Sequence, residues 1–236
     1  MSSDMSGDSV SEKAESMTLN VMLFWSFRSP YSYVLLPRIN DLRWTYDVAI
    51  DLRIVHPAAI RNPTYFARMD PLARPYIMKD SARVAAFHGM AFRRPVPDPI
   101  AQDLVTLAIA PEQPLAVRLG RLGIAATERG RGLEFATEVS SVLWDGTVNG
   151  WDQGHHLAKA AARSGLDLAA LDRAIIRDPA HHDAGLDANG RALHDSGHWG
   201  VPTMVFDGEP FFGQDRFDVL VWQLKRRGLK KRTQPE

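Results

Sequence analysis

The sequence predicts an α/β protein whose sheet is assembled from two distant parts of the chain, with an all-helical block between them. Three observations predict this class. The chain opens with a strand–helix–strand pattern, continues with a long stretch of helical patterns, and closes with a strand–strand–helix pattern. At 236 residues the chain is long enough to bury a substantial core.

The first part of the predicted sheet is a β-α-β unit. Residues 19–27 are mostly apolar and rich in β-forming side chains, which predicts a buried strand. The strand ends before Ser29 and Pro30, and serine followed by proline is a strong helix-start signal, with Ser29 as N-cap and Pro30 at the first helical position. A second strand is predicted over residues 48–55, and the right-handed crossover rule makes it parallel to the first.

The middle of the chain shows helical patterns and no convincing strand. Alanine is abundant there, as helix propensity favours, and glycine or proline separates the segments. Helices are predicted over residues 80–89, 113–130, 133–145, 154–164 and 168–177.

The last part returns to strands. Residues 203–206 and 210–212 flank Asp207 and Gly208, a pair typical of a hairpin turn, and a closing helix over residues 215–227 ends at Gly228. The predicted division of the chain is therefore a disordered leader (1–18), the N-terminal half of the core (19–70), a helical insertion (71–196), the C-terminal half of the core (197–228) and a basic tail (229–236).

Composition excludes several classes of function. The chain has no cysteine, so it cannot form a disulfide, a thiolate nucleophile or a Cys-ligated metal site. The 28 Lys and Arg residues balance the 28 Asp and Glu residues, which leaves no global field for nucleic acid or anionic lipid. The start of the chain has no apolar signal segment, so we expect a cytoplasmic protein with neither a nucleic-acid nor a membrane partner.

Two pairs of adjacent histidines suggest a metal site at first sight. Neighbouring side chains on a helix point about 100° apart and rarely share one ion, so no metal is expected. The histidines concerned are His155, His156, His181 and His182.

Three short segments could carry chemistry. Ser29 lies where a strand feeds a helix N-terminus, which offers free N–H groups and the positive end of the helix dipole. Pro202 at the entry to a strand frees the backbone of Val201, although its residue pattern alone favours a trans turn. Asp215 fits an N-cap or first-turn acid. Each segment also has a purely structural interpretation, with Ser29 only capping its own helix.

Together the three segments resemble a known family. Residues 27–33 (Phe-Arg-Ser-Pro-Tyr-Ser-Tyr), 198–203 (His-Trp-Gly-Val-Pro-Thr) and 207–216 (Asp-Gly-Glu-Pro-Phe-Phe-Gly-Gln-Asp-Arg) look like the 2-hydroxychromene-2-carboxylate isomerase family, which is related to kappa-class glutathione transferases. The resemblance covers roughly residues 19–228 and implies a thioredoxin-like core of DsbA type with a helical insertion. In the DsbA plan, the four positions 29–32 read Cys-x-x-Cys; here they read Ser-Pro-Tyr-Ser.

The resemblance implies glutathione as cofactor and assigns residues to it. Ser29 would be catalytic and hydrogen-bond the glutathione sulfur, Pro202 would be cis, and the backbone of Val201 would pair with the cysteinyl backbone. The γ-glutamyl end would be held by Gln214, Asp215 and Arg216. The implied enzyme is an isomerase that converts cis and trans forms of an aromatic, conjugated keto acid by reversible thiolate addition, and the implied assembly is a homodimer.

The sequence is compatible with two other functions. One is a kappa-like transferase that conjugates glutathione to electrophiles, and the other is a non-catalytic thioredoxin-fold module that binds peptides. The family's Gly-Asn loop for glutathione does not align with residues 56–63 or 69–72, so the glycyl end has no assigned residue. Candidates for contact with the aromatic substrate, although such residues are more often core or surface, are Trp144, Asp145, Trp151, Tyr76 and His88.

Overall fold

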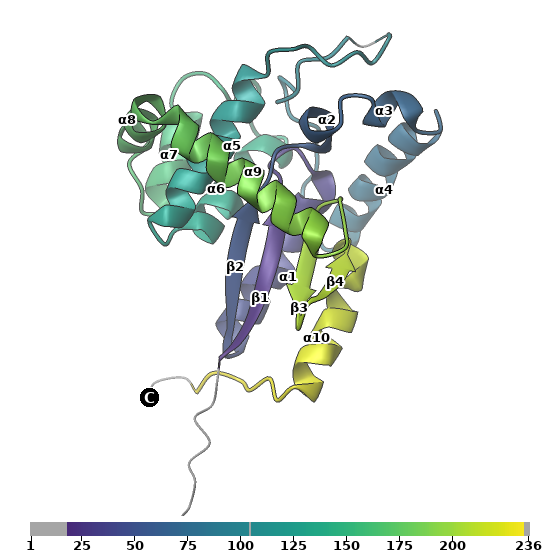
Figure 1. Ribbon diagram of the computed structural model, residues 1–236, viewed down its shortest axis with the longest axis vertical. Helices are drawn as coiled ribbons and strands as arrows, with labels where there is room; N and C mark the ends of the chain where they lie inside the picture. Colours follow the sequence, from purple (N-terminus) through teal and green to yellow (C-terminus); the bar gives the residue numbers. More distant parts are fainter. Residues whose placement is uncertain (1–17, 104, 234–236) are drawn as a thin grey trace, which may run out of the picture.

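The computed structural model describes residues 18–103 and 105–233 and has the expected α/β architecture (Figure 1). Its four-stranded sheet has the order β2-β1-β3-β4. The predicted leader, apart from Thr18, and the last three residues of the predicted basic tail lie outside the described residues.

The first half of the sheet forms as predicted. β1 (Leu19–Trp25) and β2 (Val48–Ile54) pair in parallel along their whole length, and α1 (Pro30–Thr45) connects them. Ser29 is the N-cap of α1, and its hydroxyl oxygen accepts a hydrogen bond from the Ser32 N–H at 3.2 Å. The serine–proline pair therefore starts the helix as the sequence indicated.

The region between the two halves of the sheet is helical. Between residues 71 and 196, with Leu104 outside the described chain, the structure shows no strand but an isolated bridge between Gln102 and Ile109. Two short helices precede this region, and six longer ones make it up: α2 (Ala58–Arg61), α3 (Tyr65–Arg68), α4 (Ala73–Phe87), α5 (Pro114–Glu128), α6 (Gly132–Trp144), α7 (His156–Arg163), α8 (Leu168–Arg177) and α9 (Pro179–Asp195).

Two of these helices differ from the prediction. α4 begins seven residues before the predicted start, because Pro75 falls in the first turn, where its missing N–H is not needed. α9 was not predicted, since its glycines, histidines and aspartates dilute the apolar periodicity. Its start signal was nevertheless present: the Asp178 carboxylate caps the helix through the His181 N–H, and Pro179 follows at the first position.

The second half of the sheet is an antiparallel hairpin. β3 (Thr203–Phe206) pairs with both β1 and β4 (Glu209–Phe212), and the turn residues Asp207 and Gly208 have φ of 51° and 77°, as an Asp-Gly turn requires. The predicted closing helix is divided into a single 3₁₀ turn, η1 (Gln214–Arg216), and α10 (Phe217–Arg226).

Helices cover both faces of the sheet. Alternate residues of β1, Val21 and Leu23, join the main core with α1 and α10, while Phe24 packs on the opposite face against Leu193 of α9. In Figure 1, α9 runs across the front of the sheet and α1 lies behind it. Within the described residues, no helix has the length and apolar character needed to cross a membrane.

Candidate active site

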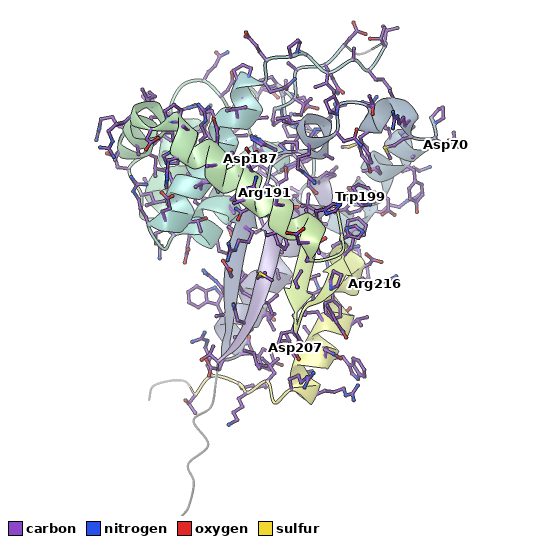
Figure 2. All side chains as sticks on the ribbon, viewed as in Figure 1. Asp70, Asp187, Arg191, Trp199, Asp207 and Arg216 are labelled. Carbon is purple, nitrogen blue, oxygen red and sulfur yellow. The ribbon has the colours of Figure 1, made fainter. Side chains whose placement is uncertain are left out.

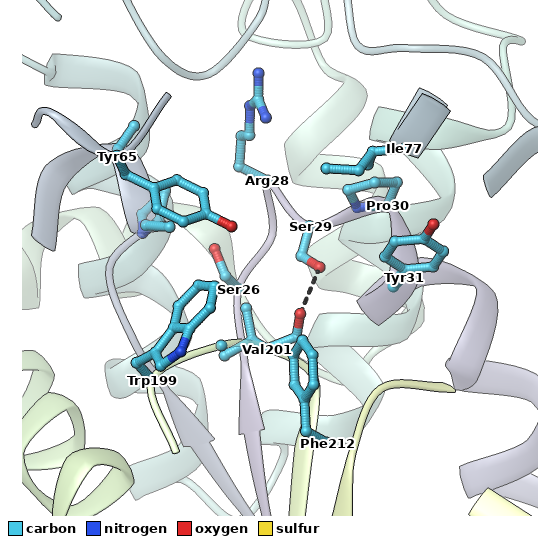
Figure 3. Close-up of a pocket in the computed structure, with 14 residues that line it drawn as sticks. Ser26, Arg28, Ser29, Pro30, Tyr31, Tyr65, Ile77, Trp199, Val201 and Phe212 are labelled. Carbon is cyan, nitrogen blue, oxygen red and sulfur yellow. Dashed lines mark hydrogen bonds between the residues drawn. The ribbon is translucent and has the colours of Figure 1, made fainter. Parts of the chain in front are cut away.

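The loop after β1 and the loop before β3 meet at Ser29. The Ser29 hydroxyl donates to the Val201 carbonyl across 3.2 Å, which joins positions 172 residues apart in the sequence (Figure 3). The Val201–Pro202 peptide bond is cis. The trans turn favoured by the residue pattern is therefore wrong, and the cis bond implied by the family resemblance is confirmed.

An open cleft lies over this meeting point. Its walls are largely aromatic: the rings of Tyr65 and Trp199 are 5.1 Å apart, and Phe212 is 6.2 Å from Trp199. The Val201 N–H has no acceptor within the part of the chain that the structure describes. The cleft therefore offers a ligand the Ser29 hydroxyl, the Val201 N–H and apolar walls.

The cleft is lined by neutral groups and a single cation, Arg28. Burial, together with the hydrogen bond to Asp80, raises the pKa of Tyr31 well above its ordinary value, so this phenol stays protonated and donates to the carboxylate at 2.8 Å. Burial also raises the pKa of Tyr65 and lowers the pKa of His198, which stacks under Phe212. Among the described residues, the lining of the cleft includes neither a carboxylate nor an imidazole.

The third predicted segment lies beside the cleft rather than in it. The Gly213 N–H donates to the Pro202 carbonyl at 2.9 Å, which places Gln214 next to the cis-proline loop. Gln214 and Asp215 line a separate depression between α4 and the start of α10, and the Asp215 carboxylate pairs with Arg216 at 3.1 Å. Figure 2 shows Arg216 on the outer side of this segment.

The structure thus brings Ser29, Val201 and Pro202 together. Gln214, Asp215 and Arg216 lie just beyond the end of β4, next to the cis-proline loop. Asp215 belongs to the first turn of η1 and Gly213 takes the cap position, with φ of 94°. Of the two local interpretations of Asp215, the first-turn acid is confirmed and the N-cap is wrong.

The five residues suggested for substrate contact do not line the cleft. Trp144 and Trp151 are buried, and their indole N–H groups donate to the carbonyls of Phe27 and Pro97. Asp145 follows α6, and Tyr76 and His88 lie on or at the end of α4.

Sequence patterns did not identify the side chains that form the walls of the cleft. Arg28, Trp199 and Phe212 lie within the quoted motif segments, so proximity to a motif could have identified them. Tyr65 has no such signal, because only the fold returns the short helix α3 to the cleft.

Among the described residues, no group of three or more His, Asp or Glu side chains is arranged to hold a metal. One of the two histidine pairs has other partners. His181 Nε2 lies 2.6 Å from Glu128, and His182 Nδ1 lies 2.7 Å from the Asp178 carbonyl.

Behind Arg28 lies a buried ion-pair cluster. Arg28 forms a two-pronged contact with Asp98, at 2.9 and 3.2 Å, and Arg94 reaches the same carboxylate at 2.5 Å. Burial alone would raise the pKa of Asp98, but the charge and hydrogen bonds of Arg28, with those of Ile100 N–H and Arg94, outweigh it and lower the pKa.

Replacing Asp98 with asparagine is expected to destabilise the protein in a pH-dependent way. The substitution leaves two guanidinium groups without their carboxylate, which costs about 3 kcal/mol for a largely buried pair. Because the folded pKa of Asp98 is depressed, its contribution is complete above a pH of about 4 and is lost as the pH falls through the folded pKa. Urea unfolding of both proteins at several pH values should show a constant difference near neutrality that shrinks in acid; a difference that persists unchanged in acid would contradict this.

The strand order, the cis proline and a helix that starts at the site define a thioredoxin-like protein, here without any cysteine. The chain belongs to the family of the DSBA-like thioredoxin domain, whose profile matches residues 20–225. A comparison with curated proteins finds no match.

Solved structures with the same fold are distant in sequence. A 2-hydroxychromene-2-carboxylate isomerase superposes with a TM-score of 0.64 at 19% identity, covering 89% of this chain and 96% of its own. A probable DsbA oxidoreductase from Streptomyces coelicolor has a TM-score of 0.64 at 20% identity, covering 92% and 93%. The cytosolic disulfide reductase DsbM from Pseudomonas aeruginosa has a TM-score of 0.56 at 15% identity, covering 88% and 100%.

Proposed function

We propose that this protein is a glutathione-dependent cis–trans isomerase of an aromatic, conjugated keto acid. The observation that carries the proposal is the position of Ser29 at the start of a 16-residue helix, with its hydroxyl on the Val201 carbonyl before a cis proline. A chain with no cysteine cannot perform disulfide exchange by its own thiols, in contrast to what the name of the disulfide reductase DsbM denotes. The missing thiol would therefore come from the ligand.

The backbone of Val201 suits the cysteinyl residue of glutathione. Its N–H is without an acceptor in the described chain, and its carbonyl takes the Ser29 hydroxyl. A cysteinyl backbone added as a short strand would bond both groups of Val201 and release the Ser29 hydroxyl toward the sulfur. The cytosolic disulfide reductase DsbM, at 15% identity, has also been solved with glutathione, which supports this choice of ligand.

Ser29 and α1 would favour the thiolate form of the bound sulfur. A free thiol has a pKa of about 8.5, and the positive end of a helix lowers it. A hydroxyl that donates to the sulfur adds a charge-assisted hydrogen bond of comparable strength. Asp215 would hold the ammonium at the γ-glutamyl end, in the depression that it shares with Gln214, if the tripeptide extends past Phe212.

The reaction follows from these roles. The thiolate adds to the β-carbon of the substrate's conjugated C=C bond, and the displaced electron pair moves onto the carbonyl oxygen as an enolate. The former double bond is now single and rotates. The enolate then collapses, re-forms the double bond and expels the thiolate, so glutathione is regenerated. The apolar walls at Tyr65, Trp199 and Phe212 would face the aromatic part of the substrate.

Calorimetric titration with glutathione tests the proposal. We expect saturable binding of one molecule per chain, and weaker binding in Asp215→Ala because one ion pair to the ammonium is lost. Absence of binding at millimolar glutathione would overturn the proposal. Thiol titration during turnover separates the alternatives, since an isomerase returns glutathione and a transferase consumes it.

A further inference from the structure

A second hollow adjoins the Ser29 cleft. It has a volume of about 410 Å³, enough for the carboxylate end of a small organic molecule, and it lies at the start of α4. Arg28 and Ile77 line both the cleft and the hollow, so the two are neighbours that share part of their walls. In Figure 3 the Arg28 side chain extends away from Ser29, between Tyr65 and Ile77.

Three arginines converge on this hollow. Arg28, Arg74 and Arg94 line it, and two acids balance them in part. The Asp98 carboxylate lies behind the wall, with 16% of its side chain exposed, and is engaged by two of the guanidinium groups. Asp70 lies at the outer rim of the α3–α4 region and accepts a hydrogen bond from the Leu72 N–H (Figure 2). Among the described residues that line or back the hollow, three arginines thus face two carboxylates, an excess of one positive charge.

Two further features make the hollow electropositive. The three guanidinium groups line one hollow and repel one another: burial lowers the pKa of Arg74, the charges of Arg28 and Arg94 lower it further, and the charge of Asp98 opposes this. The N-terminus of the 15-residue helix α4 borders the hollow, with no acidic residue in its first turn and no side-chain cap. An anion in the hollow would relieve this repulsion and interact with the helix dipole.

We propose that the hollow binds a carboxylate of the small molecule that occupies the Ser29 cleft, with Arg74 as its principal contact. The surplus of one charge matches a carboxylate rather than a doubly charged phosphate, and the planar guanidinium fits two carboxylate oxygens. The link to the reacting part of the molecule rests on the proposed function. The carboxylate would belong either to an acidic substrate or to the glycyl end of glutathione.

Cinnamate and cinnamamide are suitable probes because they share one aromatic, conjugated skeleton. Cinnamate carries a carboxylate where cinnamamide carries a neutral amide. In calorimetry on the protein without glutathione, we expect cinnamate to bind more tightly than cinnamamide. Arg74→Gln should weaken cinnamate binding about tenfold, the value of one charge-assisted hydrogen bond, and leave cinnamamide unchanged. Arg74→Lys, which keeps the charge, should recover part of the loss, and a thermal melt of each variant verifies folding.

Arg68→Gln is the matched control, because Arg68 is exposed on the neighbouring helix α3 and does not line the hollow. A parallel titration with glutathione distinguishes the two sources: loss of cinnamate binding in Arg74→Gln assigns the substrate carboxylate, and loss of glutathione binding assigns the glycyl carboxylate. The proposal is overturned if Arg74→Gln weakens the binding of neither cinnamate nor glutathione. Since the cinnamate arm needs no glutathione, its outcome is independent of the proposed function.

Discussion

Ser29→Ala is expected to lower isomerase turnover about 100-fold while the protein remains folded, because loss of one preorganised donor to a developing anion has effects of this size. The substitution also removes the N-cap of α1, which costs only about 1 kcal/mol of stability. The pKa of bound glutathione should rise by about one unit, since a charge-assisted hydrogen bond to the thiolate is lost. The ultraviolet absorbance of the thiolate, followed against pH, measures this shift.

Ser32→Ala is the matched control for Ser29→Ala. The Ser32 hydroxyl belongs to the same four-residue segment and is buried, but it has no hydrogen-bond partner among the described residues. Its removal should change neither turnover nor the pKa of bound glutathione. Ser29→Gly separates capping from catalysis, because glycine costs a helix start only a few tenths of a kcal/mol. Wild-type turnover in Ser29→Gly and Ser29→Ala would assign Ser29 to capping alone.

Trp144→Ala is expected to produce the largest loss of stability, about 4 kcal/mol. The Trp144 ring is 1% exposed and stacks near Tyr33 and Phe92, and its Nε1–H donates to the Phe27 carbonyl at 2.8 Å. Trp144→Phe keeps most of the packing but leaves that carbonyl without its donor, which should cost about 2 kcal/mol. Because Phe27 precedes Ser29 by two residues, both variants should also loosen the site and lower glutathione affinity.

Urea unfolding measures the stability of both Trp144 variants, with Trp222→Phe as control. The Trp222 ring is 54% exposed on α10, so its replacement should change the free energy of unfolding by less than about 0.5 kcal/mol. If Trp144→Phe were as stable as Trp222→Phe, the hydrogen bond from α6 to the site loop would be without energetic importance.

Local signals predicted most of the elements, and their failures have physical causes. The serine–proline start of α1 and the Asp-Gly turn between β3 and β4 depend on neighbouring residues, so the sequence identified both. α9 was missed because it is stabilised by its packing on the sheet, including Leu193 against Phe24, rather than by a clear apolar period. The last helix differs from the prediction in that a 3₁₀ turn over Gln214–Arg216, which follows Gly213 at φ 94°, precedes α10.

The site shows the same division. Absence of cysteine, read from the sequence, excludes disulfide exchange, and the residue types at Ser29, Val201 and Pro202 indicated two segments that the fold brings together. The aromatic walls and the arginine-lined hollow could not be foreseen, because Tyr65, Arg74 and Trp199 come from α3, α4 and the loop before β3, with no mutual spacing in the chain. Adjacent residues determine short-range steric and hydrogen-bonding preferences, whereas the residues that line a cleft depend on how distant segments pack.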